Sequence, residues 1–281
     1  MIARVFPRRT KATPIDDMSF VGEPGLFVPD AITEVHISVT FTWDLPLVDR
    51  LVASWERIAP VAVGGPALES RGEDFVPGLY LKEGYVITSR GCPNRCSFCS
   101  VWRREGNEVR ELPIRDGWNV LDDNLLRCSE NHIRSVFAML KSQPHRAEFT
   151  GGLEARMLRP WHVELIRDLK PHQLFFAYDE EADWDPLVQA AKLMENGGCL
   201  NRTLCRVYVL IGFPGDTMDH AEYRLNRVVS LGMFPMAMLF RDTKGKTTAE
   251  WRRFQRLWAR PALIAARRRN PGNASPNSSG R

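Results

Sequence analysis

From residue 84 onward, short apolar runs alternate regularly with segments that carry apolar residues at helical spacing. The short runs predict strands, and the segments whose apolar residues recur three and four positions apart predict helices. The expected strands are residues 85–89, 118–121, 146–150, 173–178, 206–211 and 236–240, and the expected helices are 129–143, 161–169, 185–196, 217–231 and 247–258. Six strands that alternate with helices predict an α/β fold with a parallel sheet, either open or curled toward a barrel.

The first 83 residues predict a smaller α/β region. Residues 2–6, 34–41 and 60–63 read as strands, and residues 47–58 as a helix. A strand, a helix and a strand in succession form the unit of a parallel sheet. We therefore expect an N-terminal α/β region (1–83), a main α/β unit (84–246), an Arg-rich C-terminal helix (247–270) and a disordered tail rich in Pro, Asn, Ser and Gly (271–281).

Composition and charge narrow the classes of protein. Hydrophobic residues make up 44% of the chain and charged residues 26%, which is ordinary for a globular protein. The net charge is +4, but eight arginines and no acidic residue lie after position 250, so the rest is slightly acidic. No apolar run approaches the roughly 18 residues of a membrane span, and no apolar segment follows the N-terminus as in a secretory signal. Six cysteines are too few for a disulfide scaffold, so we expect a reducing, cytoplasmic location.

Polar or glycine residues follow every strand of the predicted main sheet. In parallel α/β folds, ligands bind at the carboxyl ends of the strands, so these residues gather where a site is expected. In chain order they are Cys92, Asp122 and Asp123, Gly151 and Gly152, Asp179 and Glu180, Gly212 and Gly215, and Arg241 and Asp242.

Three cysteines in the first of these loops form the clearest motif. Cys92, Cys96 and Cys99 have the spacing Cys-x3-Cys-x2-Cys, which lets three thiolates converge on one soft metal centre. A closed structural zinc site needs four protein ligands, and the loop holds no fourth Cys or His. Three ligands instead favour an iron–sulfur cluster with one open iron.

The motif, with Phe98 before its third cysteine and a strand before its first, resembles the radical S-adenosylmethionine superfamily. The resemblance covers about residues 84–242. It implies a partial (β/α)6 parallel barrel and a 4Fe–4S cluster held by Cys92, Cys96 and Cys99. It also implies that the open iron binds S-adenosylmethionine. Reductive cleavage of that cofactor then gives a 5′-deoxyadenosyl radical, which abstracts hydrogen from a substrate.

The resemblance implies that further residues contact the cofactor. Phe98 and the glycines of the fifth strand end, Gly212 and Gly215, match positions near the adenine. Contacts to the rest of the cofactor are expected from Asp123, Gly151, Gly152, Glu154 and Asp179. The Gly-Gly-Glu element of the family normally follows the second strand, whereas here it follows the third. The acidic end of the second strand therefore stays an alternative to Glu154 for binding the amino group.

Two regions depart from the family pattern. Residues 100–116 read as a polar hairpin or loop rather than as a long helix. The N-terminal region is similar to the tail of the cobalamin-binding domain of one branch of the family, but it is short and lacks an Asp-x-His-x-x-Gly motif. We therefore expect His36 to be an ordinary surface or core residue, and Cys128, Cys199 and Cys205 to be small buried side chains.

The substrate cannot be identified from the sequence, and a small molecule, a nucleoside or a peptide each fit. The resemblance implies oxygen sensitivity and an external one-electron reductant of the flavodoxin or ferredoxin type. One alternative is modification of tRNA or DNA, because Trp251, Phe254 and Trp258 interleave with arginines near the C-terminus. A second alternative is a non-catalytic iron–sulfur redox protein, although carriers usually supply four ligands.

Overall fold

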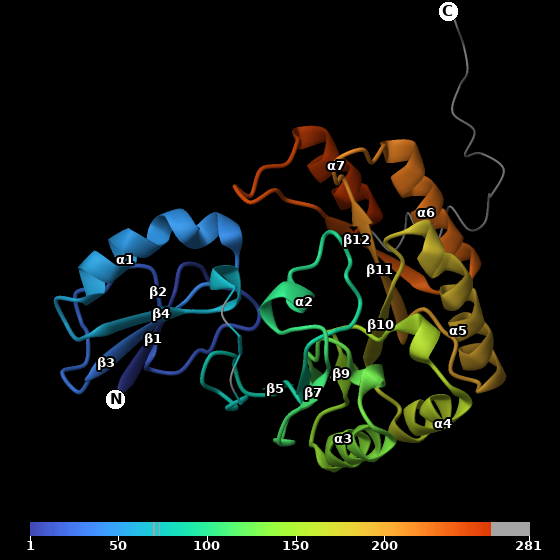
Figure 1. Cartoon of the computed structure of the whole chain (residues 1–281), viewed down its shortest axis with the longest axis horizontal. Coiled ribbons are helices and arrows are strands. Elements are labelled where there is room, and N and C mark those ends of the chain that lie inside the picture. The colour runs from blue at the N-terminus through green and yellow to red at the C-terminus, as the bar shows by residue number, and fades with distance from the viewer. Residues whose placement is uncertain (70, 73, 260–281) are drawn as a thin grey trace, which may run out of the picture.

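The computed structural model describes residues 1–69, 71–72 and 74–259, and the chain folds around two parallel β-sheets (Figure 1). Each sheet has its own cluster of buried apolar side chains. One cluster is built around Trp55 in the N-terminal region, and the larger one lies between the six-stranded sheet and its helices. The mixed α/β class with parallel sheets is therefore confirmed. The predicted tail at 271–281 lies outside the described residues.

The N-terminal sheet has four parallel strands in the order β2-β1-β3-β4. The predicted strand–helix–strand unit is confirmed, and its helix buries Leu51 and Trp55 against the sheet. Strand β2 was not predicted, because its three residues are half-buried or exposed and carry no alternating pattern. The elements are β1 (Ile2–Phe6), β2 (Ser19–Val21), β3 (Glu34–Ser38), a 3-10 helix (Thr42–Leu47), α1 (Val48–Trp55) and β4 (Val61–Gly64).

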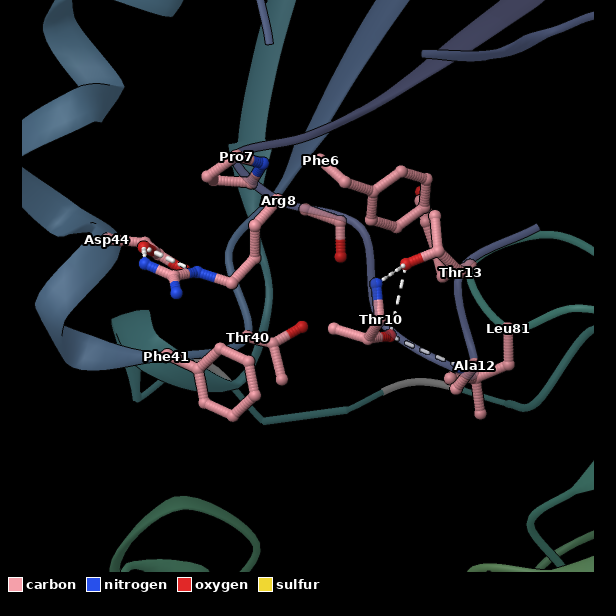
Figure 2. Close-up of a pocket in the computed structure, with 12 residues that line it drawn as sticks. Phe6, Pro7, Arg8, Thr10, Ala12, Thr13, Thr40, Phe41, Asp44 and Leu81 are labelled. Carbon is pink, nitrogen blue, oxygen red and sulfur yellow. Dashed lines mark hydrogen bonds and ion pairs between the residues drawn. The ribbon is translucent and has the colours of Figure 1, made fainter. Parts of the chain in front are cut away.

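A small cavity of about 70 Å³ lies at the carboxyl ends of β1 and β3 (Figure 2). Its wall includes Phe6 and Phe41 and the hydroxyl-bearing side chain of Thr40. Asp44 is 1% exposed and accepts hydrogen bonds from the guanidinium of Arg8, at 2.7 and 2.9 Å from Nε. The buried carboxylate beside this cavity is thus neutralised within the N-terminal region itself.

The second sheet has six parallel strands, which lie side by side in chain order, β5-β8-β9-β10-β11-β12. Helices α3 to α6 follow its outer side in Figure 1. The strands are β5 (Tyr85–Val86), β8 (Asn119–Val120), β9 (Glu148–Phe149), β10 (Gln173–Ala177), β11 (Cys205–Ile211) and β12 (Phe234–Leu239), and the helices are α3 (Glu130–Ser142), α4 (Pro160–Leu169), α5 (Trp184–Asn196), α6 (Met218–Ser230) and α7 (Ala249–Trp258). All six predicted strands and five predicted helices are present.

The predicted helix faces and most of the predicted helix starts are confirmed. Helix α3 begins after Ser129, whose hydroxyl accepts the backbone N–H of His132 at 3.3 Å as an N-cap. Its apolar face is buried as predicted from the spacing. Helix α5 begins at Trp184, one residue before the predicted start at 185, and Asp183 precedes it. Asp183 accepts the backbone N–H groups of Asp179 and Glu180.

Among the described residues, no helix combines the length and the apolar character that crossing a membrane requires.

Candidate functional site

The cysteines lie on a loop that a short hairpin holds at the edge of the six-stranded sheet. Strand β6 (Ser89–Arg90) pairs antiparallel with β7 (Arg110–Glu111), and α2 (Val101–Arg104) follows the third cysteine. The prediction of a hairpin or loop in place of a long helix is confirmed. We call residues 91–100 the cysteine loop. Gly91 begins it with φ +92°, and a Cβ there would lie 2.1 Å from the Glu108 carbonyl oxygen, so only glycine fits.

The three thiols share one neighbourhood. Cys92, Cys96 and Cys99 are partly exposed and none is in a disulfide. Burial raises the pKa of Cys96 to about 11, and the neighbouring thiols of Cys99 and Cys92 contribute to that rise. Burial likewise raises the pKa of Cys99, again with a contribution from Cys92. The side chains therefore lie close enough to influence one another's ionisation.

The thiols are not arranged as a finished ligand cage. Within the ranges described above, no group of three or more His, Cys, Asp and Glu side chains is positioned to hold a metal ion. The donor set nevertheless fits an iron–sulfur cluster in its chemistry, because three soft sulfur donors share one short loop. Metal binding here requires the side chains to rotate toward a common centre and lose their protons.

The end of β8 fixes the base of the cysteine loop. Asp122 is 1% exposed and accepts hydrogen bonds from Thr88 N, Thr88 Oγ1 and Ser89 Oγ at 2.6, 2.6 and 2.7 Å. Asp123 accepts the backbone N–H of Gly91 at 2.9 Å. Burial raises the pKa of both carboxyl groups. Asp123, expected as a cofactor contact, thus holds the backbone just before Cys92.

The ends of β8 and β9, the two alternatives expected to bind the cofactor's amino group, lie close together. Asn124, after β8, donates from Nδ2 to Glu154 Oε2 at 2.8 Å and to the sulfur of Cys92 at 3.3 Å. Arg127 donates to both oxygens of Glu154, at 2.8 and 2.9 Å. Burial alone would raise the pKa of Glu154, but these hydrogen bonds outweigh it and lower the pKa. Glu154 is therefore an ionised carboxylate one side chain away from the first cysteine.

The two glycines after β9 have different surroundings. A Cβ on Gly151 would lie 2.5 Å from the Asp122 carbonyl oxygen, so this glycine lets the ends of β8 and β9 pack closely. Gly152 has φ +94°, and its nearest atom to a built Cβ is the Phe175 carbonyl oxygen at 4.0 Å. Of the two, Gly152 is the one with open space beside it.

The end of β10 brings further acidic groups to the loop. Asp179 accepts the backbone N–H of Leu210 at 2.7 Å, which links β10 to β11. Burial raises the pKa of Asp179 to about 6. The charges of Asp183 and Glu180 contribute to the raised pKa of Cys96, so this strand end also lies near the thiols.

The glycines after β11 have different surroundings. Gly212 has φ +73°, and a Cβ there would lie 2.9 Å from Cδ2 of Trp251, so α7 fills the space on that side of it. The expected contact of Gly212 with a cofactor stays a prediction. Gly215 has φ +88° and no atom within 4 Å of a built Cβ. Phe98, on the cysteine loop, is 38% exposed.

The remaining cysteines match the expectation in two of three cases, since Cys128 is only half-buried. Cys205 and Cys199 are buried, and the Cys205 thiol donates to the Cys199 carbonyl oxygen at 3.5 Å. Burial raises the pKa of Cys128 to about 12. The ring nitrogens of His36 lie 2.6 Å from the Tyr80 hydroxyl and 2.9 Å from Glu34.

Sequence reasoning placed Asp122 and Asn124 at the second strand end, an alternative site for the amino group, but did not predict the contacts that these two side chains make. Asp122 clamps the start of the hairpin and Asn124 contacts a cysteine sulfur. A signal was present, since both flank Asp123 at a strand end next to the cysteine loop in the predicted sheet.

A scan against protein-family models finds no family that matches the chain, and a search of curated proteins finds no match either. The chemistry of the site must therefore be argued from its own residues. These are three thiols, the buried carboxyl groups of Asp123 and Asp179, and the ionised carboxylate of Glu154.

Proposed function

We propose that the chain is a radical S-adenosylmethionine enzyme in which Cys92, Cys96 and Cys99 hold a 4Fe–4S cluster. One observation carries this proposal. The three thiols of the Cys-x3-Cys-x2-Cys motif lie at the carboxyl edge of the six-stranded parallel sheet, beside carboxyl groups from three successive strand ends. This edge is where parallel α/β folds bind their ligands.

The strand order supports the same proposal. Six parallel strands adjacent in chain order, with helices on the outer side, are what a partial (β/α)6 barrel requires. We infer that the sheet curves in this way and that its inner face, which bears the side chains of Tyr208, Met236 and Met238, receives the substrate. Met238 is 45% exposed, so part of this face is accessible.

When bound, the cluster would pass one electron from an external reductant to S-adenosylmethionine, whose S–C5′ bond would cleave to give methionine and the 5′-deoxyadenosyl radical. The residues of the chain hold and orient these groups. Asn124 and Asp123 fix Cys92 and the backbone before it, and Glu154 offers an ionised oxygen for the cofactor's amino group. Asp179, with its pKa near 6, can hold or release a proton close to neutral pH.

The remaining parts of the proposal follow from this chemistry. A cluster with an open iron is oxygen-sensitive and needs an external one-electron reductant of the flavodoxin or ferredoxin type. A reducing cytoplasm suits it.

The nucleic-acid alternative loses part of its motivation. Phe254 and Trp258 are 8% and 2% exposed, and Trp251 packs against Gly212. Phe254 and Trp258 are part of the core and are not available to stack on bases, while Trp251 is half-buried against it. Arg252, Arg253 and the other described arginine of α7 remain exposed, while residues 260–269 lie outside the described part of the chain.

The test is anaerobic reconstitution with iron and sulfide, followed by dithionite and S-adenosylmethionine. We expect 5′-deoxyadenosine from the wild type and from Cys199→Ala, whose cysteine is buried away from the loop. We expect none from Cys96→Ala. Equal product from Cys96→Ala would overturn the proposal, and a bound cluster without any product would favour the non-catalytic redox protein.

A further inference from the structure

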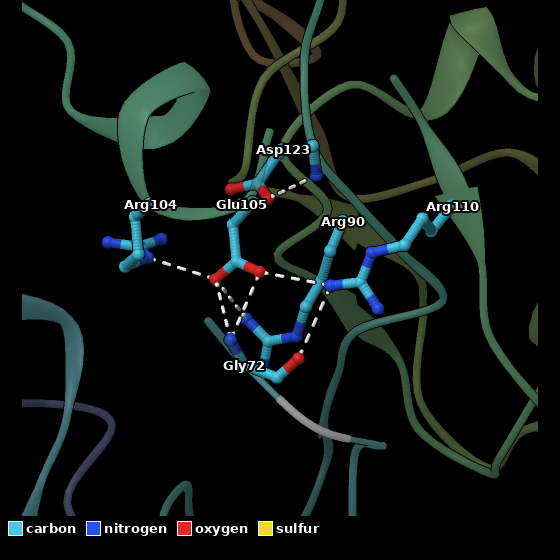
Figure 3. Close-up of polar contacts among 7 residues, drawn as sticks. Gly72, Arg90, Arg104, Glu105, Arg110 and Asp123 are labelled. Carbon is cyan, nitrogen blue, oxygen red and sulfur yellow. Dashed lines mark hydrogen bonds and ion pairs between the residues drawn. The ribbon is translucent and has the colours of Figure 1, made fainter. Parts of the chain in front are cut away.

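A buried carboxylate stands at the base of the cysteine loop. Glu105, the residue after α2, is 2% exposed and accepts hydrogen bonds from three guanidinium groups (Figure 3). The distances are 2.9 Å from Arg104 Nε, 3.2 Å from Arg110 Nη2 and 3.4 Å from Arg90 Nη1. The backbone N–H of Gly72 donates to it as well, at 3.1 Å. We call Arg90, Arg104, Glu105 and Arg110 the arginine cage.

The members of the cage come from both sides of the cysteine loop. Arg90 ends β6 just before the loop, and Arg104 ends α2 just after it. Gly72 belongs to the segment that joins the N-terminal sheet to the six-stranded one. Gly106, the residue after Glu105, accepts the backbone N–H of Cys92 at 3.3 Å. A single carboxylate thus ties together the two flanks of the loop, and its neighbour in sequence holds the first cysteine.

The cage carries more positive charge than its carboxylate neutralises. Three guanidinium groups surround one carboxylate, which leaves two surplus positive charges. The arginine side chains are 18%, 11% and 29% exposed, so solvent screens these charges only partly. These charges lie close to the thiols along the chain, since Arg90 is two residues before Cys92 and Arg104 is five residues after Cys99.

We propose that the arginine cage is a positioning device for the cysteine loop that also keeps positive charge beside the centre held by the thiols. The charge role rests on the proposed function, whereas the positioning role does not. Three thiolates make an iron–sulfur centre anionic, and each added electron makes it more so. Nearby positive charge favours the reduced form, because the net charge around a cluster helps to set its reduction potential.

The experiment removes opposite charges from the same contact. Glu105→Gln deletes the carboxylate charge, and Arg104→Gln deletes one of its guanidinium partners. In the metal-free protein, both substitutions loosen the loop, so the rate at which iodoacetamide alkylates Cys92 should rise several-fold in each. In the reconstituted protein, a redox titration followed by electron paramagnetic resonance should move the midpoint to more positive potential for Glu105→Gln and to more negative potential for Arg104→Gln.

Opposite directions distinguish a charge effect from simple damage. A tenfold change in the ratio of reduced to oxidised cluster corresponds to about 59 mV for one electron, which such a titration resolves. Shifts in the same direction, or none, would overturn the charge role, and unchanged alkylation would overturn the positioning role. If Glu105→Gln does not fold, Arg104→Lys replaces it: this variant alters the same contact but keeps the charge, so its midpoint must stay near that of the wild type while that of Arg104→Gln falls.

The matched control is Asp44→Asn in the N-terminal region. Asp44 is also a buried carboxylate paired with arginine, but it lies beside the cavity of the other sheet. The substitution Asp44→Asn should leave both the alkylation rate of Cys92 and the midpoint potential unchanged. If the wild type takes up no cluster, the proposed function fails, while alkylation of the metal-free protein still decides the positioning role.

Discussion

The two parallel sheets of this chain have different chemistry at their carboxyl ends. In the N-terminal sheet, the ends of β1 and β3 border a cavity of about 70 Å³ whose buried carboxylate, Asp44, is paired with Arg8 (Figure 2). In the six-stranded sheet, three strand ends direct acidic groups toward a loop that carries three cysteines. The carboxylate at the first end is paired with an arginine, whereas the second end gathers three thiols that form no disulfide and lie on the loop flanked by the arginine cage.

This contrast shows that the topology of a sheet does not by itself decide the chemistry at its carboxyl edge. A parallel sheet gathers its strand ends at one edge in both regions, because every strand runs in the same direction. The two edges differ in whether the side chains gathered there form pairs with one another. The N-terminal region supplies one carboxylate and its arginine partner, while the main unit supplies three thiols, and burial raises the pKa of two of them, Cys96 and Cys99. A reactive centre is expected only at the second edge.

The largest expected effect concerns metal uptake. Alanine at Cys92, Cys96 or Cys99 should abolish binding of the cluster, since each removes one of three ligands. Alanine at His36 in the N-terminal sheet should leave iron and sulfide content at the wild-type level. Chemical assay of iron and sulfide after anaerobic reconstitution measures both. Loss of the cluster in His36→Ala would show that the N-terminal region shares the site and would break the contrast between the sheets.

Stability should suffer when either buried carboxylate is replaced, and more at Glu105 than at Asp44. Glu105→Gln leaves three largely buried arginines without their partner, which costs about 3–5 kcal/mol, whereas Arg8 beside Asp44 is 45% exposed and solvent screens its charge. Burial alone would raise the pKa of Glu105, but its arginine partners outweigh this and lower it. The stabilisation by Glu105 is therefore present above the unfolded pKa of about 4.3 and lost as the pH falls through the lower folded value. Urea unfolding at pH 7 and at acid pH measures this. A difference that persists fully at acid pH would contradict the ionic origin.

The glycines after β11 offer a matched pair. Both have positive φ, but only Gly212 faces a neighbouring ring. Gly212→Ala should destabilise the protein by about 2–4 kcal/mol, because the left-handed backbone and the contact with Trp251 both penalise a Cβ. Gly215→Ala should cost only about 1–2 kcal/mol. Thermal unfolding compares them, and equal losses would show that the indole does not occupy the space over Gly212.

The last expected effect has the opposite sign, a gain in stability. Burial raises the folded pKa of Asp179 to about 6, above its unfolded value of about 3.9. The folded protein therefore loses stability as the pH rises from about 4 through 6, and the full penalty applies above that. Asp179→Asn lacks the penalty and should be more stable at pH 7 by up to about 3 kcal/mol. The advantage should vanish below pH 4, and an advantage that is independent of pH would refute the assignment.

The sequence predicts much of the fold, because the apolar pattern reports what each element buries. All six main strands follow from their apolar runs, and Ser129 follows from the preference of serine for helix starts. Strand β2 was not predicted because it is short and half-exposed. The site is predictable only in its ligands: the spacing of three cysteines is local information. The role of Asp122, the link from Asn124 to Glu154 and the cage at Glu105 depend on residues distant in sequence, and one sequence does not encode those pairings in a readable pattern.

The most direct test of the central claim is the electron paramagnetic resonance spectrum of the anaerobically reconstituted, reduced protein before and after addition of S-adenosylmethionine. If Cys92, Cys96 and Cys99 hold a 4Fe–4S cluster with one open iron, the cluster signal must change when the cofactor binds. A spectrum that the cofactor leaves unchanged, or a purified protein that holds zinc in place of iron, would contradict the account.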